Sequence, residues 1–253
     1  MLLSCIPLCL GILSVQVFHE AAHFLVAKVR NIKLGRPTPI PSPQVGTFGC
    51  ITPLLSFPKN RSALFDLAFS GPVAGMTISL FMMSVGLYMT THATEAALSG
   101  FPVVPVGFFK CSLLTSLVVS GLAPKLMMLP LAQPIPIHPL FLSGFAGLIS
   151  SALNLLPVFR LDGGRIITTL FGPRFGGISS AFTLLLMLSY SISGASGIAF
   201  TWGLLIVFLQ RRTEVPVRDD VTPVDDYRFG AWVVALGAAL LALTPFPGAP
   251  WFL

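Results

Sequence analysis

The sequence predicts an all-α polytopic membrane protein with about six membrane helices (range five to seven) and a small membrane-associated β element near residues 44–52. Of its 253 residues, 54% are hydrophobic and 9% are charged, whereas an average soluble domain has about 25% charged residues. In addition, five stretches of roughly the ~20 residues that a helix needs to cross a bilayer contain no Asp, Glu, Lys or Arg. These stretches are residues 1–19, 67–94, 126–159, 175–210 and 229–253.

The N-terminal third predicts two long helices separated by a β segment. Residues 1–29 are expected to form the first membrane helix rather than a signal peptide, because a basic n-region and a small-residue cleavage site are both missing. The prolines of PTPIPSP (37–43) exclude a helix interior, and QVGTFGCIT (44–52) predicts a strand or hairpin whose glycines allow close backbone approach. PKNRSALFD (58–66) leads into the second helix, where GPVAG (71–75) lets helices pack closely.

The middle of the chain is less regular. Residues 91–139 hold a shorter apolar segment between proline-rich flanks, which fits an interfacial helix, a re-entrant helix or a span. A clear apolar helix over about 140–157 follows. It ends in NLLPVFRLDGGRI, where Pro157 and the pair Gly163 and Gly164 are expected to break regular structure.

The C-terminal part is expected to form further helices around one polar loop. Residues 176–210 fit two short helices or one long broken helix, residues 211–228 a solvated loop, and residues 229–244 a last helix. We expect a single domain over residues 1–253, with a core at about 1–170 and C-terminal helices at 176–244.

The basic residues indicate membrane topology rather than nucleic-acid binding. The net charge of +6 is spread over short loops, and no basic patch interleaved with aromatic residues occurs. The expected partner at this point is therefore the lipid bilayer, and no nucleic acid.

The segment HEAAH carries half of a metal site. His19 and His23 are four residues apart, so both imidazoles lie on one helix face, where they can bind one Zn²⁺. Glu20 is rotated by about 100° around the helix axis, and can face a water molecule at the metal without being a ligand. This pattern supplies two ligands and a general base. A glutamate in an apolar stretch is costly, which favours a functional role.

A catalytic zinc normally has three protein ligands, so one ligand is still missing. The candidates are His92, His138, Asp66, Glu95 and Asp162. The last follows a long apolar helix and precedes two glycines, which let backbone and ligand approach closely. An ordinary Asp-Gly turn is the alternative. The hypothesis of a metal site requires this aspartate to come within coordination distance of both histidines.

Together the two halves resemble the site-2 protease family of intramembrane zinc metalloproteases (peptidase M50). The family pattern is HExxH on one membrane helix and N-x-x-P…D-G on a later one, here Asn154-Leu155-Leu156-Pro157…Asp162-Gly163. The strings GTFGCIT, FPKNRSALFDLAFSGPVAG and NLLPVFRLDGGRI look like the branch of plastids and cyanobacteria, which includes the plant proteins named for ethylene-dependent gravitropism deficiency and yellow-green leaves. The resemblance covers roughly residues 15 to 170, and no motif position departs from the active pattern.

The resemblance implies that His19, His23 and Asp162 bind one zinc ion and that Glu20 is the catalytic base. Substrate-binding or site-supporting roles would fall to the following residues: Asn154, Pro157, Gly163, Gly46, Thr47, Phe48 and Gly49. The GTFG segment would receive an unwound substrate as an added strand; a purely structural hairpin is the alternative. The implied substrates are membrane proteins with a transmembrane segment.

The implied location is a plastid membrane, thylakoid or envelope, with a bacterial inner membrane as the alternative. The sequence shows no Arg- and Ser-rich transit segment. Either the protein needs no such segment, or the sequence is a mature or partial form of the protein. Two other functions stay open. A divalent-metal transporter would need further ligands along a path, and a non-catalytic metal-binding scaffold would not need Glu20.

Overall fold

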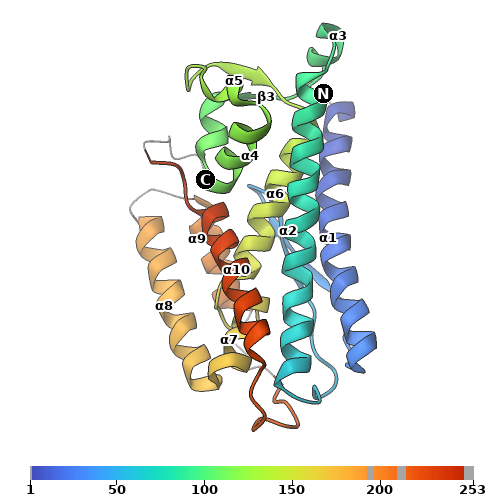
Figure 1. The fold of residues 1–253 in the computed structure, drawn as a ribbon, viewed down its shortest axis with the longest axis vertical. Helices are drawn as coiled ribbons and strands as arrows, with labels where there is room; N and C mark the ends of the chain where they lie inside the picture. Colours follow the sequence, from blue (N-terminus) through green and yellow to red (C-terminus); the bar gives the residue numbers. More distant parts are fainter. Residues whose placement is uncertain (1, 193–196, 210–214, 248–253) are drawn as a thin grey trace.

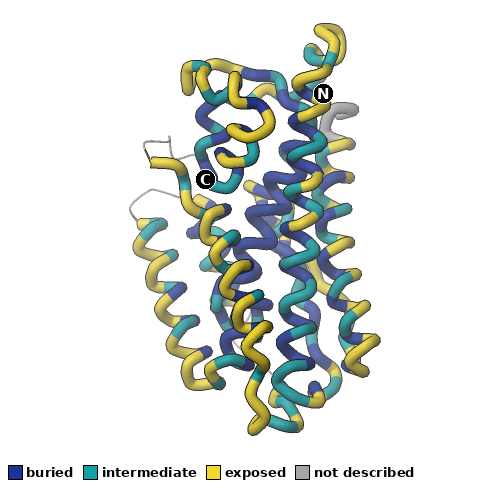
Figure 2. The backbone as a smooth tube through the Cα atoms, in the orientation of Figure 1, coloured by how far each residue is buried: buried dark blue, intermediate teal, exposed yellow. Residues whose placement is uncertain are grey.

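The structure is a helical bundle built around one central helix (Figure 1). The computed structural model describes residues 2–192, 197–209 and 215–247. Helix α6 (Pro139–Asn154) occupies the centre and is buried along almost its whole length (Figure 2). Around it pack α1 (Leu2–Arg30), α2 (Arg61–Thr91) and α10 (Asp226–Leu243). The other helices are α3 (Glu95–Leu98), the 3-10 helix η1 (Val106–Lys110), α4 (Leu113–Leu122), α5 (Pro124–Met127), α7 (Asp162–Phe171), α8 (Pro173–Ile192) and α9 (Gly197–Leu209).

Helices α1, α2, α8 and α10 are long and apolar enough to cross a bilayer. Three further apolar helices, α4, α6 and α9, are shorter, at 10–17 residues. The outer helices expose large apolar side chains, such as Leu25 on α1, Leu185 on α8 and Val234 on α10. Extended apolar faces of this kind are rare on soluble proteins and are expected where lipid is the solvent. The predicted class of a polytopic helical membrane protein is therefore confirmed.

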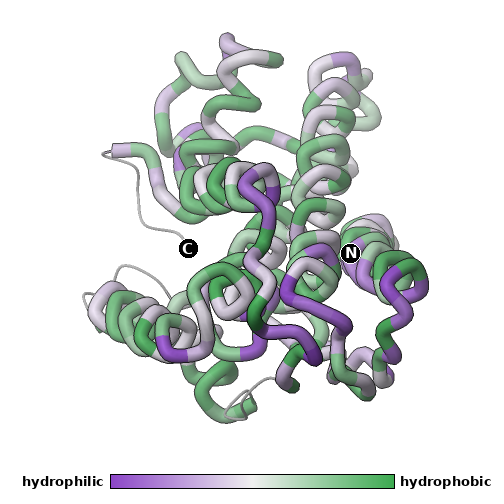
Figure 3. The backbone as a smooth tube through the Cα atoms, turned by 60° about the horizontal axis from the view of Figure 1, so that its bottom comes forward, coloured by the Kyte–Doolittle hydropathy of each residue, from purple (hydrophilic) through white to green (hydrophobic). Residues whose placement is uncertain are grey.

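Hydrophilic residues gather at one end of the bundle, where α1 ends and α2 and α10 begin (Figure 3). Asp66 of α2 accepts hydrogen bonds from Arg30 of α1 and from Arg228 of α10, the latter from Nε at 2.7 Å. Residues 215–225, the described part of the predicted polar loop, have no helix or strand and lie against this hydrophilic end of the bundle. Asp220 of this loop pairs with Arg61 Nε at 2.8 Å.

The predicted β element is an antiparallel hairpin of β1 (Thr38–Ser42) and β2 (Gly46–Ile51). Its register pairs Thr38 with Ile51 and Ser42 with Gly46, with an irregularity between Pro39 and Pro41. Proline lacks the N–H that a central strand needs, so β1 is suited to a sheet edge. The other edge of β2 pairs with no strand in the part of the chain that the structure describes. A second small antiparallel sheet pairs β3 (Val103–Pro105) with β4 (Pro134–Pro136), which are separated in the chain by η1, α4 and α5.

Around the D-G motif the sequence interpretation was wrong in one respect. Gly163 and Gly164 do not break regular structure but lie in the first turn of α7, which begins at Asp162. A β-carbon at Gly163 would lie 2.0 Å from the carbonyl oxygen of Leu155, just past the end of α6. The glycine therefore lets the start of α7 pack directly on the end of α6, and this packing outweighs its weak helix propensity.

Helix boundaries differ by a few residues from those predicted. The central helix ends at Asn154 rather than near 157, and the last helix begins at Asp226 rather than 229. The region 176–210 is described as two helices, α8 and α9, which was one of the two alternatives. The glycine-containing connection at 193–196 and residues 210–214 lie outside the described residues.

Candidate metal centre

His19 and His23 lie one turn apart on α1 and are both buried, with exposed fractions of 4% and 5%. The Nδ1 atom of His23 lies 2.8 Å from the backbone carbonyl oxygen of Leu67 in α2. Because a carbonyl only accepts, Nδ1 must carry the proton and donate it. The Nε2 atom of neutral His23 then keeps its lone pair, as a metal ligand requires.

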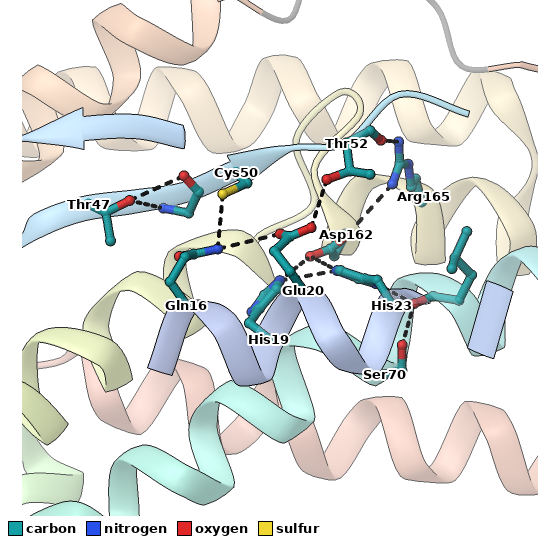
Figure 4. A network of polar contacts seen from close by, with 12 residues as sticks. Gln16, His19, Glu20, His23, Thr47, Cys50, Thr52, Ser70, Asp162 and Arg165 are labelled. Carbon is teal, nitrogen blue, oxygen red and sulfur yellow. Dashed lines mark hydrogen bonds and ion pairs between the residues drawn. The ribbon is translucent and has the colours of Figure 1, made fainter. Parts of the chain in front are cut away.

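Helix α7 brings Asp162 to these two imidazoles (Figure 4). Its Oδ2 atom lies 3.2 Å from His19 Nε2 and 3.3 Å from His23 Nε2, and the two nitrogen atoms are 3.1 Å apart. Atoms bound at about 2.1 Å to a tetrahedral zinc are separated from one another by roughly 3.4 Å. The three donor atoms thus form a triangle of nearly the size that one zinc ion needs, in a buried position.

Gly71 of the GPVAG segment keeps the space beside these donor atoms open. A β-carbon at this position of α2 would lie 2.2 Å from His23 Nε2 and 2.7 Å from His19 Nε2. Any larger residue would therefore fill the space that an ion would occupy. The close helix approach predicted for GPVAG occurs, and it takes place at the candidate site itself. The residues present fit a bound metal ion.

The other candidate ligands lie elsewhere. Asp66 is paired with two arginines, and His138 accepts a hydrogen bond from the backbone N–H of Leu140 at the start of α6. His92 stacks on Tyr88, and Glu95 is exposed on α3. Within the described residues, the cluster with metal-ligand geometry is His19, His23 and Asp162.

Glu20 lies beside this cluster and is 9% exposed. One carboxylate oxygen accepts a hydrogen bond from the hydroxyl of Thr52 at 2.8 Å, and the other accepts from Gln16 Nε2 at 3.4 Å. The carboxylate faces a cavity of about 30 Å³ that His23 and Asp162 also line. This volume is large enough for one water molecule. Glu20 is therefore placed next to the cluster without being part of it, as the helix geometry predicted.

Asn154 and the β2 strand also meet at the cavity. Gly49 has a φ of +103°, and a β-carbon there would lie 2.3 Å from Asn154 Nδ2. Thr47 lies on the same strand and its hydroxyl accepts a hydrogen bond from the Gly49 N–H at 3.1 Å, while Phe48 is buried. Gly46 begins β2 with a φ of +82°.

Among the predicted substrate-binding or site-supporting residues, only Asn154 lines the cavity, and the part of β2 that lines it is Cys50 and Ile51 rather than residues 46–49. Pro157 lies in the connection between α6 and α7, and Gly163 packs against the Leu155 carbonyl group. These two residues shape the connection between α6 and α7 that places Asp162 beside the two histidines.

Comparison with known families identifies the family of this chain. The model of peptidase family M50 matches residues 7–192, which include both histidines, Glu20, Asn154 and Asp162. The chain belongs to peptidase family M50. No solved structure gives a significant match to this M50 chain.

Several curated plant proteins are similar to this M50 member. "Probable zinc metalloprotease EGY1, chloroplastic" of Oryza sativa subsp. japonica is 36% identical to this chain. The match covers 96% of this chain and 41% of the rice protein. "Probable zinc metalloprotease EGY2, chloroplastic" of Arabidopsis thaliana is 33% identical over 90% of the chain and 40% of its own length. "Probable zinc metallopeptidase EGY3, chloroplastic" of Arabidopsis thaliana is 33% identical, over 96% of this chain and 43% of the relative's length. The chain thus spans less than half the length of these relatives.

Sequence reasoning missed three side chains of this M50 site: Gln16, Thr52 and Arg165. Gln16 lies one helical turn before Glu20, so a search for polar neighbours at that spacing would have found it. Thr52 stood inside the string GTFGCIT, but no local signal tied its hydroxyl to Glu20. Arg165 lies one turn after Asp162, and its guanidinium donates to the Thr52 carbonyl oxygen at 3.1 Å. Only the folded chain brings these three together.

Substitution of Gly49 is expected to disrupt the site from the strand side. In the Gly49→Ala variant the new methyl group meets the Asn154 side chain, at a φ that alanine rarely adopts. We expect a loss of about 1–3 kcal/mol in unfolding free energy from strain and displacement of Asn154. Thermal denaturation in detergent measures the loss. Gly121→Ala on α4, where an added β-carbon would meet no side chain or neighbouring element within 4 Å, is the matched control. Equal melting temperatures for both variants would contradict the expected clash.

Proposed function

We propose that this chain is a zinc metalloendopeptidase of the site-2 type, which hydrolyses peptide bonds in or near transmembrane segments of membrane proteins. The observation that carries the proposal is the convergence of His19, His23 and Asp162 beside the buried Glu20, inside a bundle of apolar helices. The names of the relatives, which call them probable zinc metalloproteases, support it. Because those relatives are named chloroplastic, we also propose a multi-pass location in a plastid membrane, thylakoid or envelope.

One zinc ion would be held by the two Nε2 atoms and by Oδ2 of Asp162. When bound there, zinc would supply Lewis acidity that polarises the scissile carbonyl group and acidifies water. The donation from His23 Nδ1 to the Leu67 carbonyl oxygen holds the imidazole in its orientation. Arg165 Nη1, 3.9 Å from the other oxygen of Asp162, adds positive charge beside the ligand carboxylate.

Glu20 would act as the general base. Its carboxylate faces the cavity in which a water molecule fits, and takes one proton from the attacking water. The same carboxyl group then returns that proton to the leaving amine nitrogen as the C–N bond breaks, so the base is regenerated. Burial excludes bulk water, which strengthens the electrostatic interactions that steer these transfers.

Substrate binding is assigned to β2 and Asn154. A transmembrane helix satisfies its carbonyl groups internally, so a scissile segment must unwind before it can be attacked. The edge of β2 that faces away from β1 offers main-chain donors and acceptors to an extended segment. Asn154, which touches Gly49 of that strand, is close enough to hold the segment near the cavity.

A metal transporter is the competing function. It would need a series of ligand sites across the membrane, whereas the described residues hold one such cluster. The orientation of Glu20 toward the cavity without ligand distance to the cluster also favours hydrolysis over a purely structural metal.

Metal removal tests the proposal directly. The purified protein in proteoliposomes, given a fusion protein with one transmembrane segment, is expected to cleave it. A strong chelator should abolish cleavage, since the Lewis acid is lost, and added Zn²⁺ should restore it while Mg²⁺ should not. Product formation is followed by mass spectrometry. Cleavage that continues in the metal-free protein would refute the proposal; zinc uptake without cleavage would favour the transporter.

A further inference from the structure

The carboxylate of Glu20 is held from the end of the β2 strand. Thr52 directly follows β2 and is buried, and its hydroxyl donates to Glu20 Oε2 at 2.8 Å. In this bond the hydroxyl is the donor and the carboxylate oxygen the acceptor. A hydrogen bond to a buried charge is strong and directional. Thr52 therefore restricts the rotation of the carboxylate about its side-chain torsions.

A second contact ties the other carboxylate oxygen to the same strand. Gln16 Nε2 lies 3.4 Å from Glu20 Oε1 and 3.3 Å from the sulfur of Cys50, which belongs to β2. Gln16 thus bridges the carboxylate and the strand. One oxygen of Glu20 is thus linked to Thr52, just after β2, and the other is linked through Gln16 to Cys50 of β2. Figure 4 shows the carboxylate between the strand and α1.

The position of Thr52 is itself fixed by the helix that carries Asp162. Arg165 Nη2 donates to the backbone carbonyl oxygen of Thr52 at 3.1 Å, and its side chain is buried between α7 and the strand. One turn of α7 therefore presents Asp162 to the two histidines and holds the residue that orients Glu20. The distance between the carboxylate and the metal ligands is set by one connected unit of β2, α7 and α1.

We propose that Thr52 is a positioning residue: its hydroxyl aims the Glu20 carboxylate, so that β2 orients the base as well as receiving the substrate. This inference rests on the proposed function, because aiming matters only if Glu20 transfers protons. A base must lie within hydrogen-bond reach of the proton that it takes, and small misplacements of reacting groups cost about 10²-fold in rate.

The test compares Thr52→Val, which keeps the shape and loses the donor, with Thr52→Ser, which keeps the donor. Thr52→Val should lower kcat about 10- to 100-fold while KM stays within about twofold, because ground-state binding is untouched. Bound zinc, measured by atomic emission, should remain equal to wild type. Thr52→Ser should recover kcat to within about threefold. Thr115→Val, the same change at a buried threonine of α4 whose hydroxyl has no hydrogen-bond partner among the described residues, should have no effect.

Infrared spectroscopy of the metal-free protein provides a readout that does not need turnover. The carboxylate band of Glu20 is the one lost in Glu20→Gln. It should shift in Thr52→Val but not in Thr52→Ser or Thr115→Val, because only the first removes the donor.

An unshifted band, or a kcat in Thr52→Val equal to wild type, would overturn the inference. Equal losses in Thr52→Val and Thr52→Ser would also overturn it, since the effect would then come from packing. Loss of zinc in Thr52→Val would assign Thr52 to the metal site instead. A wild-type protein that cleaves nothing would refute the proposed function, and the infrared band would then still decide whether Thr52 holds Glu20.

Discussion

Glu20→Gln is expected to abolish peptide cleavage while zinc stays bound. The amide keeps the size of the side chain and can still accept a hydrogen bond from the Thr52 hydroxyl, but cannot take a proton from water. Positioned general bases contribute about 10²–10⁴-fold, so we expect at least about a 10³-fold lower kcat. Zinc content should be unchanged, because Glu20 is not one of the three clustered donors.

Initial rates on the proteoliposome substrate measure the loss, and atomic emission measures the metal. Glu95→Gln, the same change at an exposed glutamate of α3, is the matched control and should cleave like wild type. The Glu20→Gln protein should also retain uncleaved substrates in native membranes, which a zinc chelator should release. Residual cleavage above about one tenth of wild type would remove Glu20 from the role of base.

Asp162→Asn is expected to lose both metal and activity. The substitution replaces the carboxylate of the proposed third ligand, whose Oδ2 lies 3.2–3.3 Å from both imidazole nitrogens, with a neutral amide. Removal of an outer-shell partner already weakens metal binding by about 10–100-fold, and loss of a direct ligand should weaken it more. Cleavage should fall together with zinc occupancy, in contrast to Glu20→Gln.

The affinity is measured by competition with a fluorescent zinc chelator. Asp220→Asn is the control: it makes the same change at an exposed carboxylate that pairs with Arg61, where an ion pair is worth about 0.2–1 kcal/mol. It should bind zinc like wild type. If Asp162→Asn binds zinc as tightly as wild type, Asp162 is not the third ligand, and another residue would have to complete the zinc site with the two histidines.

The helical membrane class and the first half of the candidate site were readable from the sequence. Long uncharged apolar stretches predict spans because lipid cannot satisfy an exposed backbone. The spacing of His19, Glu20 and His23 predicts their relative directions, because α-helical periodicity is local and regular. A β element at residues 44–52 was likewise indicated by strand-forming residues and glycines, whereas the prolines of 37–43 excluded a helix there without predicting that this segment forms the partner strand β1.

Tertiary structure decided what converges on those residues. Asp162 stands 139 positions after His23 in the chain, and only the packing of α7 on the end of α6 brings its carboxylate to the imidazoles. The same packing explains why Gly163 and Gly164 lie in a helix: a local propensity of about 1 kcal/mol yields to close contact between elements. Local spacing predicts directions along one helix, whereas the positions of Thr52, Arg165 and Gly71 around Glu20 and the histidines depend on contacts between elements distant in sequence.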